Sequence, residues 1–166
     1  HICATGSIGV EALILFLIIF LWTPPHFWAL ALVNKSDYRV AKIPMLPIIY
    51  GDMATRKNIF IYSLLLMPCA YLPWILNYSG NFYIIVVTLL NVEFIRRSIS
   101  VLKENKDSEK GLFVYSIFYL TFISFIGIRG LPRSIGLIQP LILLIIMCSW
   151  RIFIRSILKK ILKILL

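Results

Sequence analysis

Two polar side chains that could take part in chemistry lie where an apolar run of the chain gives way to a polar segment. His26 follows Pro24-Pro25 inside the run, and Asp37 comes eleven residues later among several cations. An imidazole is unfavourable in hydrocarbon, and prolines leave backbone carbonyls that need other partners, so a lipid-facing helix gains nothing from Pro-Pro-His. We therefore interpret residues 20 to 51 as the wall of a site.

Helical spacing places an aromatic residue beside the histidine. Trp22 and His26 are one turn apart and share a face, and a helix that continued to Asp37 would place that carboxylate on the same side, about 16 Å further along the axis. This separation suits the two ends of a large amphiphilic ligand, with Asp37 at a wet head and His26, Trp22 and Trp28 beside a deeper apolar or planar part. An aromatic belt at the membrane surface predicts the same histidine and tryptophans without any ligand, and this alternative stays open.

The segment around Asp37 is rich in cations. Its basic residues are Lys35, Arg39, Lys42, Arg56 and Lys57. They would neutralise a diphosphate, and Asp37 would help to hold a Mg²⁺ that bridges it, because this ion keeps several waters and shares substrate phosphates. The inner loops of any membrane protein are also basic, so a purely topological role remains the alternative.

Composition decides the class of protein. The chain has 166 residues, of which 60% are hydrophobic and 14% charged, with a mean hydropathy of +0.91, whereas soluble domains carry about 25% charged residues. We expect an all-α, polytopic membrane helical bundle with about five transmembrane helices. The expected spans are residues 9–33, 59–76, 82–100, 112–128 and 135–150, followed by a basic amphipathic tail at 151–166.

The net charge of +10 is distributed unevenly between the two sides of such a bundle. If the spans alternate, fifteen of the 17 cations fall in segments 34–58, 96–110 and 151–166, and only Arg129 and Arg133 fall on the other side. This bias places the Asp37 loop on the cytoplasmic or matrix side of the bilayer. It also argues against nucleic acid as a partner, because the cations form no single stripe beside aromatic residues.

A longer pattern connects these features to a known family. It consists of Leu21-Trp22-Thr23-Pro24-Pro25-His26-Phe27-Trp28-Ala29-Leu30-Ala31-Leu32, Asp37-Tyr38-x-x-Ala41 and Ile43-Pro44-Met45-Leu46-Pro47, with Thr5-Gly6-Ser7, Gly51, Thr55 and Leu112-Phe113-x-x-Ser116-Ile117-x-Tyr119-Leu120 in support. From about residue 1 to 125 the chain resembles the haem O synthases, or protoheme IX farnesyltransferases, of the UbiA-type intramembrane prenyltransferases. The resemblance implies a partial UbiA-type fold, with the C-terminal half of the domain at 1–130 and an additional hydrophobic helix and basic tail at 131–166.

The resemblance also implies an activity. Such enzymes use Mg²⁺ to bind farnesyl diphosphate, transfer its farnesyl group to the 2-vinyl group of haem B, and release haem O after water captures the resulting cation. Their setting is a bacterial inner membrane or the mitochondrial inner membrane. Carried over to this chain, the catalytic residues are Asp37, at the Mg-diphosphate end, and His26; the substrate-binding residues are Trp22, Trp28, Lys35, Tyr38, Arg39, Lys42 and Arg56.

Three departures from the family pattern shape the remaining expectations: the first Asp-rich loop is absent, Lys42 stands where a small residue is more usual, and the chain leaves the pattern after about residue 126. The first Asp-rich loop of the family has no counterpart in these residues, so half of the metal clamp is missing and we expect this chain alone to be inactive. An N-terminal half that bears that loop and haem A synthase are the candidate protein partners. Ala41 stands where other members of the superfamily have a second Asp. A prenyltransferase with a different acceptor, or a transport or assembly component without enzymatic activity, are the alternatives.

Overall fold

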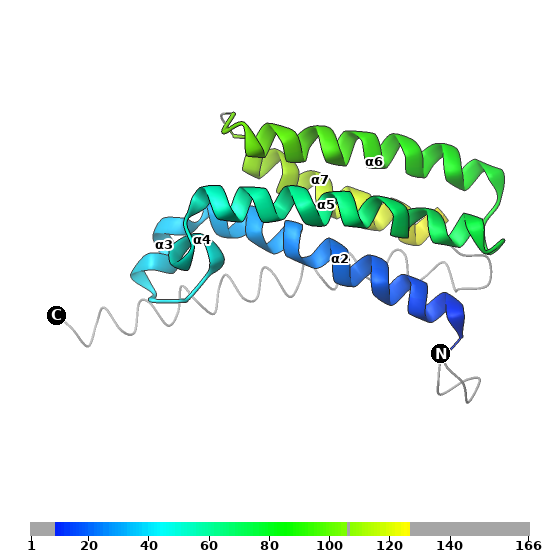
Figure 1. Cartoon of the computed structure of the whole chain (residues 1–166), viewed down its shortest axis with the longest axis horizontal. Helices are drawn as coiled ribbons and strands as arrows, with labels where there is room; N and C mark the ends of the chain where they lie inside the picture. The colour runs from blue at the N-terminus through cyan, green and yellow to red at the C-terminus, as the bar shows by residue number, and fades with distance from the viewer. Residues whose placement is uncertain (1–8, 106, 127–166) are drawn as a thin grey trace.

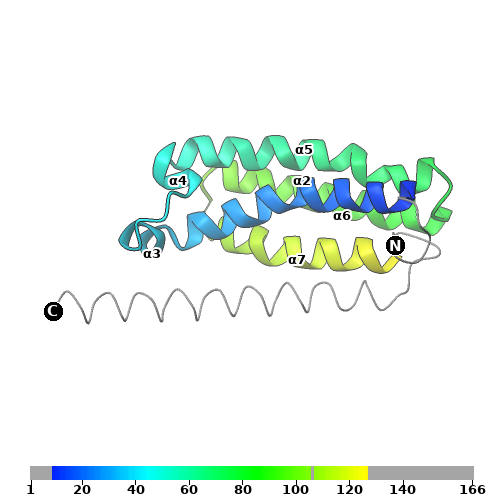
Figure 2. The same ribbon diagram turned by 90° about the horizontal axis from the view of Figure 1, so that it is seen from below.

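The computed structural model describes residues 9–105 and 107–126, and in these residues the chain is helical without strands. The elements are α2 (Val10–Val33), α3 (Lys35–Val40), α4 (Leu46–Ile49), α5 (Asp52–Ile75), α6 (Asn81–Leu102) and α7 (Ser108–Ile126). The long helices α2, α5, α6 and α7 run up and down beside one another, with α3 and α4 at one end (Figure 1). The view from below shows the same bundle, with α2 between α5 and α7 (Figure 2). The all-α prediction is confirmed, whereas the expectations for 135–150 and 151–166 fall outside the described residues.

The join between α2 and α3 corrects one expectation. α2 ends at Val33, and Asn34 has φ −107° and ψ 29°, so the helix does not run on unbroken to Asp37. The Asn34 side chain donates to the Leu30 carbonyl at 3.3 Å, and its backbone N–H binds the same oxygen at 3.0 Å. Asparagine side chains compete with helical hydrogen bonds in this way, which is a physical reason for the break. Asp37 therefore belongs to a separate short helix.

A turn reverses the chain before α5. Gly51 has φ +85°, a conformation that is open to glycine and strained for other residues, and α5 begins at the next residue. Helix α5 therefore begins at Asp52, ahead of the apolar span expected at 59–76, because polar residues that follow the turn are also helical.

The distribution of apolar side chains agrees with a membrane setting. Three helices of the described part, Val10–Val33, Asp52–Ile75 and Ser108–Ile126, are long and apolar enough to cross a bilayer. The outer faces of the bundle carry large apolar side chains, such as Phe16, Phe20 and Leu89, that are more than half exposed. A lipid-facing surface needs such residues, whereas a water-soluble surface of this extent would aggregate. The chain is an integral membrane protein.

Helix α6 is a different case from the other long helices. It was expected as a span at 82–100, but it carries three charged residues and is not among the three helices of the described part that could cross a membrane by length and composition. Its last turns contain Glu93, Arg96 and Arg97, and the carboxylate binds both guanidiniums at 2.6 Å, as the i, i+3 and i, i+4 spacing predicts. α6 nevertheless lies at one edge of the bundle and packs against both α5 and α7 (Figure 1).

Polar side chains that face the interior connect α5, α6 and α7. Tyr119 Oη donates to Asn91 Oδ1 at 2.7 Å, and Asn91 Nδ2 reaches the Met67 carbonyl at 3.5 Å. Tyr83 Oη donates to the Ala70 carbonyl at 2.8 Å, in the part of α5 where Pro68 and Pro73 interrupt the regular backbone bonds. Hydrogen bonds of this kind hold membrane helices together where apolar burial contributes little.

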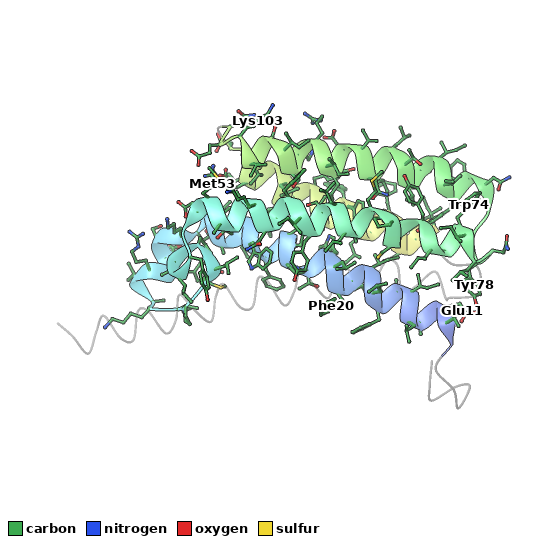
Figure 3. All side chains as sticks on the ribbon, in the orientation of Figure 1. Glu11, Phe20, Met53, Trp74, Tyr78 and Lys103 are labelled. Atoms are coloured by element: carbon green, nitrogen blue, oxygen red, sulfur yellow. The ribbon has the colours of Figure 1, made fainter. Side chains whose placement is uncertain are left out.

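The two ends of the bundle differ in charge. Figure 3 shows Lys103 at the end that carries α3 and α4, close to the start of α5, and Glu11, Trp74 and Tyr78 at the opposite end. Within residues 9–105 and 107–126, every lysine and arginine lies in segments 35–57 or 96–110, toward the first end. We call this end the cationic end. Trp74 and Tyr78 give the opposite end the amphipathic aromatic residues that favour a membrane interface.

Candidate functional site

The His26 ring is buried between aromatic rings of two helices. His26 is 1% exposed, and its ring stacks on Trp22 of α2 with centroids 4.4 Å apart and on Phe113 of α7 at 4.8 Å. The interplanar angles are 19° and 24°, so both faces of the imidazole are covered. Phe27 approaches the same ring edge-on at 5.6 Å. The orientation of the imidazole plane is therefore fixed by packing, and only the ring edge remains for polar contacts.

Ser116 of α7 connects this stack by hydrogen bonds. Its Oγ lies 2.6 Å from His26 Nδ1 and also donates to the Phe113 carbonyl at 2.7 Å. Its carbonyl oxygen accepts a hydrogen bond of 2.7 Å from Trp22 Nε1. Ser116 thus contacts the His26 ring through its side-chain oxygen and the Trp22 ring through its backbone carbonyl oxygen. We call Trp22, His26, Phe113 and Ser116 the histidine cluster.

The structure confirms that Trp22 and His26 share a face of one helix and brings Phe113 and Ser116 to them from α7. The sequence pattern contained the two α7 residues as supporting pieces of the family resemblance, but helical spacing within 20–51 carries no signal for a contact more than eighty residues away. Trp28 lies apart from this stack and makes an edge contact with Tyr62 of α5 at 5.2 Å. The two tryptophans therefore have different surroundings.

Asp37 lies on α3 at the cationic end and is exposed. Ser36 Oγ donates to its Oδ1 at 3.4 Å, a weak contact. In residues 9–105 and 107–126, no group of three or more His, Cys, Asp or Glu residues is placed to hold a metal ion. A single exposed carboxylate fits Mg²⁺ only when phosphate oxygens and waters complete the coordination, which is the usual arrangement for this ion.

The cations predicted to bind diphosphate have different surroundings. Lys35 Nζ forms an ion pair with Asp52 at 2.6 Å, which ties α3 to the start of α5. Arg39 and Lys42 are exposed on either side of the end of α3, and Lys42 has a positive φ of 52°. Tyr38, between Asp37 and Arg39, is buried at 7% exposure and anchors the short helix. Asp37, Arg39 and Lys42 are thus the accessible charges of this segment.

Arg56 has partners that sequence reasoning did not find. Its guanidinium pairs with Glu104 at 3.1 Å and with Glu109 at 3.0 Å, and it also approaches the Val101 carbonyl at 3.5 Å. The Arg56 side chain is 13% exposed. In this structure it joins α5 to the end of α6 and the start of α7. A role of Arg56 at a diphosphate stays a prediction, and it would require a change of these partners.

Comparison with known proteins agrees with the helical pattern and the motif. The UbiA prenyltransferase family matches residues 2–126. A protoheme IX farnesyltransferase of Neorickettsia sennetsu is 48% identical over 135 residues, which are 80% of this chain and 44% of that protein. Protoheme IX farnesyltransferase 1 of Mesorhizobium japonicum is 50% identical over 120 residues, 70% of this chain and 39% of that protein.

A third relative, from Polaromonas naphthalenivorans and of the same name, is 56% identical over 90 residues, 54% of this chain and 29% of that protein. No solved structure matches the chain significantly. The chain spans about two-fifths of the length of the first two relatives, at 44% and 39%. Because the family match covers all of the described helices, and with them the histidine cluster and the cationic segment, the chain belongs to the UbiA prenyltransferase family.

Proposed function

We propose that this chain supplies part of a protoheme IX farnesyltransferase, which transfers a farnesyl group from farnesyl diphosphate to the 2-vinyl group of haem B and yields haem O. The observation that carries the proposal is the 48% identity to the farnesyltransferase of Neorickettsia sennetsu over 80% of this chain. The UbiA family match over residues 2–126 includes the motif around His26, which an unrelated membrane protein with kinked helices would not need to keep.

The cationic end is suited to the diphosphate. The allylic C–O bond of farnesyl diphosphate breaks and its electron pair leaves with the diphosphate, so positive groups that stabilise this leaving group favour the reaction. Arg39 and Lys42 are accessible for such contacts beside Asp37. Asp37 would bind Mg²⁺ together with the diphosphate, and the ion would neutralise the charge that develops there. Lys35 supports this segment through its ion pair with Asp52.

The acceptor end of the reaction would lie deeper in the bundle. The π electrons of the haem vinyl group form the new C–C bond, and the resulting cation gains an oxygen from water, which loses a proton. His26 is placed among aromatic side chains of α2 and α7, away from the cationic end, and Trp28 lies on α2 between the two regions. We assign His26 and Trp28 to the porphyrin side, and Trp22 supports the histidine through their stacking contact.

We further propose a topology and partners. The clustering of cations supports a topology in which the α3 end faces the cytoplasmic or matrix side of a bacterial inner or mitochondrial inner membrane, following the positive-inside rule. The partners that go with this function are a segment that bears the first Asp-rich loop and haem A synthase, which would consume the product.

A chimera tests the proposed function. Residues 1–126 of this chain would replace the matching part of the Neorickettsia sennetsu relative, and membranes containing the chimera would be incubated with haem B, farnesyl diphosphate and Mg²⁺. Mass analysis should then find farnesylated, hydrated haem. Asp37→Ala should reduce the rate by at least about tenfold, because a carboxylate that binds the metal acts directly on the leaving group.

Asp107→Ala is the matched control, since it removes another exposed carboxylate from the same end of the bundle. Its rate should stay close to that of the unmodified chimera. The proposal fails if the inserted and folded chimera returns only haem B, or if Asp37→Ala and Asp107→Ala have equal rates.

A further inference from the structure

The Pro24-Pro25 pair interrupts the backbone hydrogen bonds of α2 near its middle. In an α-helix the N–H of each residue binds the carbonyl four residues earlier, and proline has no N–H. The two prolines therefore remove the regular donors of the Phe20 and Leu21 carbonyls. Leu21 is the twelfth of the 24 residues of α2, so it lies about 17 Å from either end of the helix. In a bilayer, bulk water is remote from these two oxygens.

Thr23 offsets one of the two losses. Its Oγ1 donates to the Ile19 carbonyl at 2.7 Å, which is the acceptor that the Thr23 N–H binds in a regular helix. The Thr23 N–H can then bind the Phe20 carbonyl through an i, i+3 bond, as in a 3₁₀ turn. The loss at Phe20 thus has a local remedy within α2.

The Leu21 carbonyl has no such remedy. The residues three and four positions later are Pro24 and Pro25, so neither a 3₁₀ bond nor an α-helical bond can form. The next backbone N–H, that of His26, is the regular donor of the Trp22 carbonyl. A bond from this N–H to Leu21 instead would only transfer the missing hydrogen bond to Trp22. One backbone acceptor of α2 therefore lacks an intrahelical donor.

This carbonyl lies on the inner side of α2. A helical carbonyl points along the axis toward the residue four positions later, which here is the buried Pro25, and the Leu21 side chain packs against the buried core. The adjacent side-chain donor, Trp22 Nε1, binds the Ser116 carbonyl at 2.7 Å. Within residues 9–105 and 107–126, no side chain donates to the Leu21 carbonyl. A buried acceptor without a donor is unfavourable, so this oxygen calls for a small donor molecule.

We propose that the Leu21 carbonyl is the acceptor of a water-binding site inside the membrane, which exists because Pro24-Pro25 opens the hydrogen-bond ladder of α2. Water is the ligand that fits, because it is a small donor and the proline ring pushes the chain away from the carbonyl four residues before it. Ordered water is one of the usual partners of such carbonyls in membrane helices. The functional meaning of the site rests on the proposed function. Haem farnesylation consumes one water molecule, and this site holds one beside the histidine cluster.

The sequence allows this one carbonyl to be labelled selectively. Leu21-Trp22 is the only Leu-Trp bond in the chain, and Phe27-Trp28 is the only Phe-Trp bond. The 166-residue chain would be labelled with ¹⁵N-tryptophan and with either leucine or phenylalanine that carries ¹³C in its carbonyl group, and placed in lipid bilayers. Solid-state NMR would select the bonded ¹³C–¹⁵N pair and measure how fast magnetisation passes from water protons to that carbonyl carbon.

Transfer from water to the Leu21 carbonyl should be several times faster than transfer to the Phe27 carbonyl. The residue four positions after Phe27 is Ala31, which has an N–H, and Phe27 lies closer to the cationic end. Water that merely penetrates from that end would therefore reach Phe27 first. A transfer rate at Leu21 equal to or below that at Phe27 would overturn the proposal. The measurement needs no substrate, so its result is independent of farnesyl transfer.

The two prolines provide matched variants. Pro25→Ala restores the N–H four residues after Leu21, so a peptide bond should replace the water and the transfer rate should fall to the level of Phe27. Pro24→Ala restores the donor of Phe20 instead and should keep the transfer at Leu21. Unchanged transfer in folded Pro25→Ala, or equal loss in both variants, would refute the proposal. If Pro25→Ala loses its helical content, the comparison of Leu21 with Phe27 in the unsubstituted chain still decides the question.

The link between the site and the reaction has its own test. In the active chimera, Pro25→Ala should lower the hydrated fraction of the farnesylated haem several-fold, because a cation that is not captured by water gives up a proton to the released diphosphate and becomes an alkene. Pro24→Ala should keep the hydrated fraction of the unsubstituted chimera. An unchanged fraction in Pro25→Ala would refute the role of this water in the reaction.

Discussion

Removing the Arg56 side chain tests whether it stabilises the bundle as the structure indicates. Arg56 joins α5 to Glu109, in the first turn of α7, and to Glu104, beyond the end of α6. The two carboxylates differ in burial, because their side chains are 18% and 57% exposed, respectively. The two ion pairs should therefore contribute unequally to the free energy of unfolding.

The distances and exposures give the expected size of each contribution. Two unit charges 3.0 Å apart attract by about 5 kcal/mol at an effective dielectric constant of about 20, before the loss of hydration is subtracted. That loss offsets most of the attraction, so we expect a coupling energy of about 1–2 kcal/mol between Arg56 and Glu109. For Arg56 and Glu104 we expect less than about 0.5 kcal/mol, because exposed pairs are screened by water.

A double-mutant cycle measures these couplings. Arg56→Ala, Glu109→Ala, Glu104→Ala and the two double variants would be unfolded by a denaturing detergent in mixed micelles, with helical content as the signal. Lys57→Ala, which removes the adjacent exposed cation of α5, is the control and should change the free energy by less than about 0.5 kcal/mol. Equal couplings for the two glutamates, or none for Glu109, would refute the assignment of Arg56 to the α5–α7 contact.

Three further predictions concern single residues. Tyr119→Phe should lower the free energy of unfolding by about 1 kcal/mol, because the 2.7 Å bond to Asn91 is lost inside the bundle; the same unfolding assay checks this, and an unchanged value would contradict it. Gly51→Ala should destabilise the chain by about 1–3 kcal/mol because of the +85° φ angle, although a Cβ would meet nothing within 4 Å; stability equal to the parent would show that the turn adopts another conformation. Asp37→Ala should leave stability within about 0.5 kcal/mol of the parent because the residue is exposed, and a larger loss in the unfolding assay would mean that its role is structural.

Much of the fold could be predicted from local sequence properties. The long apolar runs predicted α2, α5 and α7, and the helix expected at 82–100 corresponds to α6 (Asn81–Leu102). The expected end of the first span at residue 33 agrees with the end of α2 at Val33, where the polar run Asn34-Lys35-Ser36-Asp37 begins. The bond from the Asn34 side chain to the Leu30 carbonyl, which accompanies this break, could not be predicted from hydropathy. The alignment of His26 with Asp37 depended on one helix continuing to Asp37, and the break at Asn34 means that this condition is not met.

The surroundings of the predicted site residues could be predicted only in part. The pairing of Trp22 with His26 follows from helical spacing, but their contacts with Ser116 and Phe113 require the packing of α2 against α7. The basic segment suggested a common role for Lys35, Arg39 and Arg56. The structure separates these residues because ion pairing depends on which carboxylates the fold brings near, and composition does not contain that information.

The short turn between α5 and α6 has a consequence for how the protein enters the membrane. Only residues 76–80 separate the two helices, and α6 contains Asn91 and three charged residues near its end. Such a helix would partition poorly into lipid as an isolated segment emerging from the ribosome. When α5 and α6 enter the membrane together as a hairpin, α6 follows the more apolar α5. The Asn91 side chain can then donate a hydrogen bond to the Met67 carbonyl as soon as both helices are inside. The five-residue connection between α5 and α6 thus allows the two helices to enter the membrane together as a hairpin.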